Sequence, residues 1–221
     1  MSELPVLYSF RRCPYAMRGR MGLWVAGIGV ELREVKLASK PPELAQVSPK
    51  ATVPVLVLAD GTVIDESLAV MRWALAKNDP RDWLNGDDQA LIAANDGPFK
   101  HHLDRYKYPT RYPDEAEGDP DSFRLHHREK GLAILIDLNA QLSSQPQLTG
   151  ERPAFADIAL FPFIRQFANT DRAWFDTQKL PHLQSWLEEH LASDLFKSIM
   201  PKFSPWKEGD TPIEFAPPSN R

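Results

Sequence analysis

Short apolar runs alternate with helical patterns over the first third of the chain. Runs of β-type residues predict strands, and apolar residues three or four positions apart predict helices. Asp60-Gly61 is a hairpin turn signal between two of these strands. The expected elements are strands over 6–10, 30–37, 53–58 and 62–64 and helices over 14–28 and 67–76. This order implies a mixed sheet with helices packed on it.

After residue 78 the pattern becomes helical and no convincing strand remains. Apolar stripes predict helices over 87–106 (bent or interrupted at Pro98), 125–142, 155–167 and 183–191. Residues 108–122 contain three prolines and five acidic residues and are expected to form an exposed loop. The fold class is therefore α/β plus all-α. Residues 1–77 form the α/β domain, 78–86 a linker, and 87–221 an all-helical domain with an irregular C-terminal tail.

Composition narrows the possible functions. The formal net charge is -4, which argues against a dedicated nucleic-acid binder. No apolar run approaches the roughly 20 residues that span a bilayer, and no signal peptide is visible at the N-terminus. The single cysteine cannot form an internal disulfide. These features favour a reducing compartment, the cytoplasm, with no membrane and no nucleic-acid partner.

The only cysteine, Cys13, lies where the first strand is expected to end and a helix to begin. Pro14 is favoured at the first helical position, which makes Cys13 the N-cap residue. Unpaired N–H groups and the helix dipole stabilise a thiolate at such a position. Arg11 and Arg12 add positive charge if they turn toward the sulfur. Ala16 replaces the second cysteine of a dithiol motif, so a monothiol here must exchange with an external thiol such as glutathione; the alternative is an inert core cysteine.

Two further segments carry weaker signals. Pro54 opens an expected strand, and a cis peptide before it would expose the Val53 backbone to an extended ligand. An ordinary trans proline at an edge strand is the alternative. Glu66 and Ser67 precede an expected helix, with Ser67 as its N-cap. Ser67 and the backbone N–H groups suit the carboxylate of a γ-glutamyl group, and Glu66 suits its amine. A simple capped helix is the alternative.

Together these motifs resemble the glutathione transferase superfamily over residues 5–200, most closely its cysteine-type members, such as the omega class and related bacterial proteins. The resemblance implies a thioredoxin-like N-terminal domain, a helical-bundle second domain, a cis proline, a glutathione site and a homodimer. Cys13 matches the catalytic cysteine, and Asp157 opens a buried core helix in which Ala154 replaces the usual Ser or Thr cap. The implied glutathione contacts are Lys40, Val53, Pro54, Glu66 and Ser67.

The expected function is glutathione-dependent thiol transfer or reduction through a mixed disulfide at Cys13, on small disulfides, glutathionyl adducts or electrophiles. One alternative is a conjugating transferase in which Tyr8, Ser9 or Tyr15 assists the glutathione thiolate. Another is a non-catalytic docking or dimerisation module. Glutathione is the expected co-substrate, beside a small-molecule second substrate. No metal is expected, because His101-His102 and His126-His127 are adjacent pairs whose members do not share a helix face.

Overall fold

The computed structural model describes residues 4–218. Its contacts divide the chain into two compact units. Within the described residues, the first unit comprises 4–84 together with 192–218, and the second comprises 85–191. No helix in residues 4–218 is both long and apolar enough to cross a membrane.

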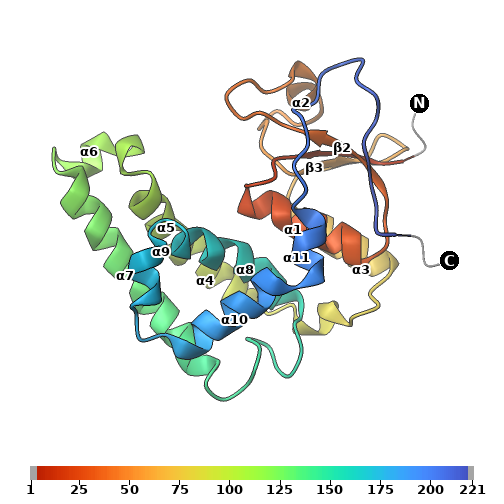
Figure 1. The fold of residues 1–221 in the computed structure, drawn as a ribbon. Coiled ribbons are helices and arrows are strands. Elements are labelled where there is room, and N and C mark those ends of the chain that lie inside the picture. The colour runs from red at the N-terminus through yellow and green to blue at the C-terminus, as the bar shows by residue number, and fades with distance from the viewer. Residues whose placement is uncertain (1–3, 219–221) are drawn as a thin grey trace. The chain divides into compact units, whose positions relative to one another are not determined.

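The first unit is a mixed five-stranded sheet with helices packed against it (Figure 1). The strands follow the order β4-β3-β1-β2-β5, with β1 parallel to β2 and the other pairs antiparallel. Its elements before residue 84 are β1 (Val6–Ser9), α1 (Pro14–Val25), β2 (Val30–Glu34), α2 (Pro42–Val47), β3 (Val55–Val57), β4 (Val63–Ile64) and α3 (Ser67–Lys77). This is the expected thioredoxin-like arrangement, and the elements fall within a few residues of their predicted ranges.

Leucines at matched positions form the centre of this sheet. Leu7 of β1 pairs with Leu32 of β2 and Leu56 of β3, and all three side chains are fully buried. Figure 1 shows α1 and α3 together beneath the strands and α2 above them. Gly22 permits the close approach of the two helices, since a Cβ there would lie 3.0 Å from the Cα of Met71. The short apolar runs of the sequence therefore form the buried centre of the sheet, and Cys13 follows the end of β1.

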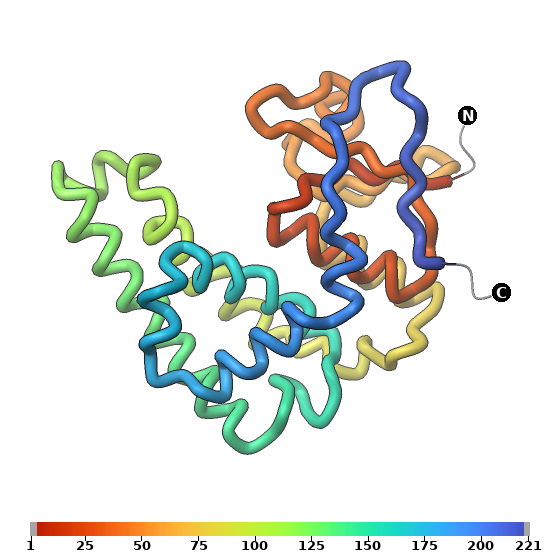
Figure 2. The backbone as a smooth tube through the Cα atoms, viewed as in Figure 1, coloured from red at the N-terminus to blue at the C-terminus, as the bar shows by residue number. Residues whose placement is uncertain are grey.

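The C-terminal segment differs from the expected irregular tail of a helical domain. After α11 (Asp194–Ile199) the chain runs along the first unit, and β5 (Glu214–Phe215) pairs with β2 (Figure 2). The backbone N–H of Leu32 donates to the carbonyl of Ile213 at 2.7 Å. An open β2 edge would leave a row of unpaired backbone groups. The tail pairs with part of this edge, and residues 192–218 belong to the first unit instead of the helical one.

The second unit is helical throughout, as expected. The expected interruption at Pro98 is present as a π-helical turn between two helices. One departure lies within this unit, because residues 108–122 contain short helices instead of a plain loop. Its elements are η1 (Trp83–Gly86) at the boundary, α4 (Gln89–Ala94), η2 (Asn95–Phe99), α5 (Lys100–Lys107), η3 (Pro109–Arg111), α6 (Pro113–Ala116), α7 (Pro120–Gln141), α8 (Phe155–Ala168), α9 (Arg172–Asp176) and α10 (Pro181–Ala192).

Helix α8 forms the core of this unit, and Asp157 anchors its start. The fully buried carboxylate accepts hydrogen bonds from the Leu148 N–H at 2.7 Å, the Thr149 hydroxyl at 2.9 Å, the Ala154 N–H at 3.2 Å and the Trp186 indole at 3.1 Å. Ala154 has no side-chain oxygen to return a cap bond. The motif therefore keeps the carboxylate half of a capping box, and Asp157 is structural, as expected.

His190 of α10 is buried against the same core and makes folding sensitive to acid. Its Nε2 lies 3.1 Å from the Gln147 side-chain oxygen, and its ring stacks on Phe161 at 5.1 Å. Burial lowers the pKa of His190 to about 4. At pH values between about 6.5, the ordinary pKa of histidine, and about 4, His190 is protonated in the unfolded chain but neutral in the folded chain. Stability therefore falls as the pH falls through this window.

The variant His190→Gln tests this acid sensitivity, because glutamine can still donate to Gln147 but does not titrate. Each unit of difference between the pKa of a group in the folded and unfolded states corresponds to 1.36 kcal/mol. Below pH 4 the protonation of His190 therefore lowers the unfolding free energy of the wild type by about 3 kcal/mol. The difference in unfolding free energy between wild type and variant should shift by about that amount, in the variant's favour, between pH 7 and pH 4. Urea unfolding at both pH values measures it. A difference that stays constant with pH would contradict the assignment.

Candidate functional site

Cys13 lies between β1 and α1 at the position that the sequence predicts. It is the N-cap residue of α1, with Pro14 at the first helical position. The turn is fixed by the Cys13 N–H, which donates to the Phe10 carbonyl at 2.9 Å, and by the Met17 N–H, which donates to the Cys13 carbonyl at 3.0 Å. The half-buried side chain can therefore be reached from solvent while its backbone is held from both sides.

The thiol of Cys13 faces the strand that begins near Pro54. Its Sγ lies 3.8 Å from the carbonyl oxygen of Val53, to which the S–H donates. The Cys13 side chain makes no cap hydrogen bond at the start of α1. The Val53–Pro54 peptide is cis, as the family resemblance implies. Residues 40 positions apart in the sequence thus meet at one point.

The charges near Cys13 differ from those that the sequence suggests. The exposed guanidinium of Arg12 packs over the Phe10 ring at 5.5 Å, and the backbone N–H of Arg11 donates to Glu34 at 2.7 Å. Arg18 and Arg20 of α1 are both fully buried. The Arg20 side chain pairs with Glu34 and donates to the Ser9 hydroxyl at 2.7 Å. Its signal in the sequence is the seven-residue spacing from Cys13, which places both on one face of α1.

Burial lowers the pKa of Arg20, and Glu34 opposes that effect more strongly than any other group. The Cys13 thiolate is a weaker influence in the same direction as Glu34. The coupling is mutual, because an anion that favours a nearby cation is itself favoured by it. Arg20 is therefore a buried cation whose charge favours the thiolate, an influence that the sequence reasoning did not assign to it.

Glu66 and Ser67 lie at the start of α3, with one correction to the sequence prediction. Glu66 is the N-cap residue and Ser67 the first helical residue, and neither makes a side-chain cap bond. The exposed Glu66 carboxylate accepts a hydrogen bond from the Lys50 ammonium at 2.6 Å. Asp65 next to it accepts from the Ser48 hydroxyl at 3.2 Å. The helix start thus offers backbone N–H groups to an anion and a carboxylate that already holds an ammonium.

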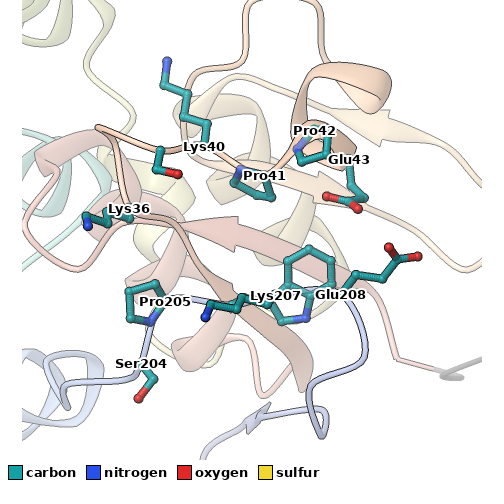
Figure 3. A pocket seen from close by; sticks show the side chains of 11 residues that line it. Lys36, Lys40, Pro41, Pro42, Glu43, Ser204, Pro205, Lys207 and Glu208 are labelled. Atoms are coloured by element: carbon teal, nitrogen blue, oxygen red, sulfur yellow. The ribbon is translucent and has the colours of Figure 1, made fainter.

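Lys40 lies apart from these contacts, at the rim of a pocket of about 670 Å³ in the same unit. The loop before α2 forms one wall and residues 204–208 of the C-terminal segment form the other (Figure 3). In that view the ammonium ends of Lys36 and Lys207 lie on one side and the carboxylates of Glu43 and Glu208 on the other. Trp206 also lines the pocket, and it packs on the cluster of Tyr8 and Val53 that Cys13 joins.

The three hydroxyls named as alternatives lie in different environments. The Tyr8 hydroxyl accepts a hydrogen bond from Arg33 at 2.7 Å, and burial raises its pKa although Arg33 opposes the rise. The Ser9 hydroxyl is fully buried and accepts from Arg20. Tyr15 is half-buried, with the Arg18 guanidinium 5.5 Å from its ring centre. Only Tyr15 of the three is accessible.

Comparison with known proteins agrees with the two-unit fold. Residues 7–82 match the family model for the N-terminal domain of glutathione S-transferase, and residues 89–189 match that for its C-terminal domain. A probable maleylacetoacetate isomerase from Caenorhabditis elegans is 36% identical over 74% of this chain and 78% of its own length. Glutathione S-transferase U19 from Arabidopsis thaliana is 25% identical over 91% of both chains.

Solved structures share the fold at lower identity. A glutathione transferase family member from Pseudomonas fluorescens, crystallised with two glutathione bound, gives a TM-score of 0.74 at 18% identity, over 90% of this chain and 92% of that one. Glutathione transferase F7 from Populus trichocarpa gives 0.73 at 20% identity, over 90% of this chain and all of that one (100%). With both domain matches and the 36% identical relative, the chain belongs to the glutathione S-transferase family.

Proposed function

We propose that this protein is a glutathione-dependent thiol transferase that uses Cys13 as its nucleophile. The observation that carries the proposal is the position of the Cys13 sulfur, at the N-terminus of α1 and 3.8 Å from the Val53 carbonyl. Membership of the glutathione S-transferase family supports glutathione as the co-substrate. The small-molecule partner is a disulfide, a mixed disulfide with glutathione, or an electrophile.

The proposed contacts to glutathione follow the groups that each part of the tripeptide offers. The Val53 carbonyl, which the thiol S–H occupies, is freed when Cys13 ionises, and an extended peptide backbone can then pair with it. The N–H groups at the start of α3, with Ser67, suit the γ-glutamyl carboxylate, and Glu66 suits its ammonium. Pro54 orients the Val53 backbone, and Lys40 suits the glycine carboxylate.

In the proposed reaction the Cys13 thiolate attacks the glutathione sulfur of a mixed disulfide. The new Cys13–glutathione disulfide forms as the old S–S bond breaks, and the substrate thiolate leaves and takes a proton from water. The thiolate of a second glutathione attacks the glutathione sulfur of the Cys13 adduct. Glutathione disulfide leaves and the Cys13 thiolate is regenerated, so each mixed disulfide consumes one free glutathione and yields the substrate thiol and glutathione disulfide.

The environments of the hydroxyls support Cys13 over hydroxyl-assisted conjugation. Tyr8 and Ser9 are buried and engaged by Arg33 and Arg20, and the raised pKa of Tyr8 disfavours a phenolate at neutral pH. Of the three residues, only Tyr15 is accessible enough to assist a glutathione thiolate. We also propose a cytoplasmic homodimer, consistent with a single cysteine and with family membership; sedimentation of the purified protein tests the dimer.

Alkylation of Cys13 tests the chemistry directly. The rate of reaction with iodoacetamide is followed against pH, with and without glutathione, and intact mass is measured after exposure to glutathione disulfide. A free cysteine thiol has a pKa of about 8.5. We expect Cys13 to be alkylated rapidly at pH values well below that. We also expect protection by glutathione and a mass gain of one glutathione. An ordinary titration with neither protection nor adduct would remove Cys13 from the mechanism.

The variant Glu66→Gln tests the γ-glutamyl end of the proposed site. Loss of a charge-assisted hydrogen bond corresponds to about 1.5–3 kcal/mol, so the KM for glutathione should rise about tenfold or more while kcat changes little. Lys50→Gln is the matched control, because it removes the Lys50–Glu66 pair and keeps the carboxylate. If both variants weaken glutathione binding equally, Glu66 acts through its ion pair with Lys50 and not through direct contact with glutathione.

A further inference from the structure

Four histidines that occur as two adjacent pairs in the sequence are brought to one place in the helical unit. His101 and His102 lie on α5, and His126 and His127 lie on α7, which packs against it (Figure 1). One ligand atom from each of His101, His102 and His127 lies within 4.8 Å of the other two. Neither pair forms a site alone, but helix packing adds His127 to the first pair.

The geometry of these three side chains points to a common binding partner. The Nδ1 atoms of His102 and His127 are 2.8 Å apart. Two neutral imidazoles at that distance share a single proton, since the other nitrogen lone pair must accept it. A metal ion bound at about 2.0–2.1 Å from each nitrogen holds them roughly 3.3 Å apart in tetrahedral geometry. For His102 and His127, an adjustment of about half an ångström therefore lets an ion replace the shared proton. The ligand atom of His101 lies within 4.8 Å of both and moves inward by up to about 1.5 Å to join them.

Packing and charge keep these nitrogens available. The His127 ring is buried and lies edge-on to Phe123 at 4.5 Å, which fixes its orientation. Burial, with smaller effects from neighbouring cations, lowers the pKa of His127 to about 4 and lowers that of His102. Both imidazoles therefore stay neutral at pH 7, the form in which histidine ligates a metal.

The surrounding charges are balanced. Arg105 and Lys130 add positive charge near His102, and the exposed His126 does the same when protonated. Glu115 faces the cluster from α6 and forms a two-point ion pair with Arg105, at 2.7 Å for each bond. That pairing offsets the positive charge of Arg105. The carboxylate is also close enough for His101 and His127 to lower its pKa, after the larger effect of Arg105.

We propose that His101, His102 and His127 form a binding site for a divalent transition-metal ion of the zinc type. Three imidazole nitrogens suit Zn²⁺, Co²⁺, Ni²⁺ and Cu²⁺, and do not suit Mg²⁺ or Ca²⁺, which prefer oxygen ligands. His101 is exposed, so an ion enters from solvent and keeps a water molecule as its fourth ligand. The site lies in the helical unit and uses no residue of the proposed thiol chemistry.

Metal titration of the full-length chain tests the proposal. The background is Cys13→Ser, which removes the only competing thiolate. Zn²⁺ binding is measured by equilibrium dialysis, and Co²⁺ binding by its visible absorption. We expect one ion per chain and an absorption spectrum typical of nitrogen ligands. His101→Gln and His102→Gln should each weaken Zn²⁺ at least about tenfold, in line with the loss of a ligand.

The controls separate this site from binding to any surface histidine. His182→Gln removes an exposed histidine on α10, and His126→Gln removes the neighbour that lies outside the three-atom cluster. Both should bind Zn²⁺ like the parent. Because His127 is buried and its replacement can disturb folding, the exposed His101 is the deciding position. Equal Zn²⁺ affinity in the parent, His101→Gln and His182→Gln proteins would overturn the proposal, as would the absence of stoichiometric binding.

Discussion

Replacing Cys13 with serine will lower the rate of glutathione-dependent disulfide reduction by at least about a thousandfold, because no mixed disulfide can form on a hydroxyl. Glutathione binding should stay within a few-fold of its wild-type strength. The proposed contacts to the tripeptide come mainly from the Val53 backbone and from the start of α3, which the substitution leaves in place. Reduction of a glutathionylated small thiol, followed by coupled oxidation of NADPH, measures the rate, and calorimetry measures the affinity.

Two further variants make this result specific. Tyr15→Phe removes the most accessible hydroxyl near α1 and should keep nearly full reductase activity. Cys13→Ala should behave like the serine variant in reduction. If Cys13→Ala instead retains or gains conjugation of glutathione to an aromatic halide, while Tyr15→Phe loses it, the hydroxyl alternative becomes the better account. A serine variant with full reductase activity would refute the thiol mechanism outright.

The elements of the first unit could be predicted because their signals are local. Short runs of β-type residues and the turn at Asp60-Gly61 mark β1 to β4, and the leucines at the centre of the sheet are fully buried. The strand at Glu214–Phe215 carried no such signal. It has two residues among several prolines, and it forms only because the edge of β2 is available to it. Local pattern cannot show that availability.

The same distinction applies to the functional residues. Cys13 and Pro54 stood out because each is unusual at its own position, one before a helix and one at the start of a strand. Arg20 and the histidine cluster depend on packing between elements, as Ser9 and Glu34 meet Arg20 only in the folded sheet. The adjacency argument against a metal site treated each helix alone. Helix packing places His127 of α7 beside His101 and His102 of α5. Residue spacing along a single helix cannot predict this contact.

Replacing Asp157 with alanine will lower the unfolding free energy by about 3–5 kcal/mol, the largest stability effect that we expect from one side chain. Four donors converge on this carboxylate, and the substitution leaves all of them without it inside the core. Burial raises the pKa of Asp157, although the four hydrogen bonds oppose the rise. The expected loss thus comes from unsatisfied donors and a cavity rather than from a favourable buried charge.

The asparagine variant separates these contributions atom by atom. Oδ1 accepts from the Leu148 N–H and the Trp186 indole, and asparagine retains that oxygen. Its amide nitrogen replaces Oδ2, where the Thr149 hydroxyl can turn to accept but the Ala154 N–H loses its acceptor. Asp157→Asn should therefore cost about 1–2 kcal/mol, the penalty for one lost buried partner. Urea unfolding measures both variants, with Asp137→Ala, exposed on α7, as the near-neutral control. Equal losses for alanine and asparagine would mean that the charge, and not the count of satisfied donors, holds the start of α8.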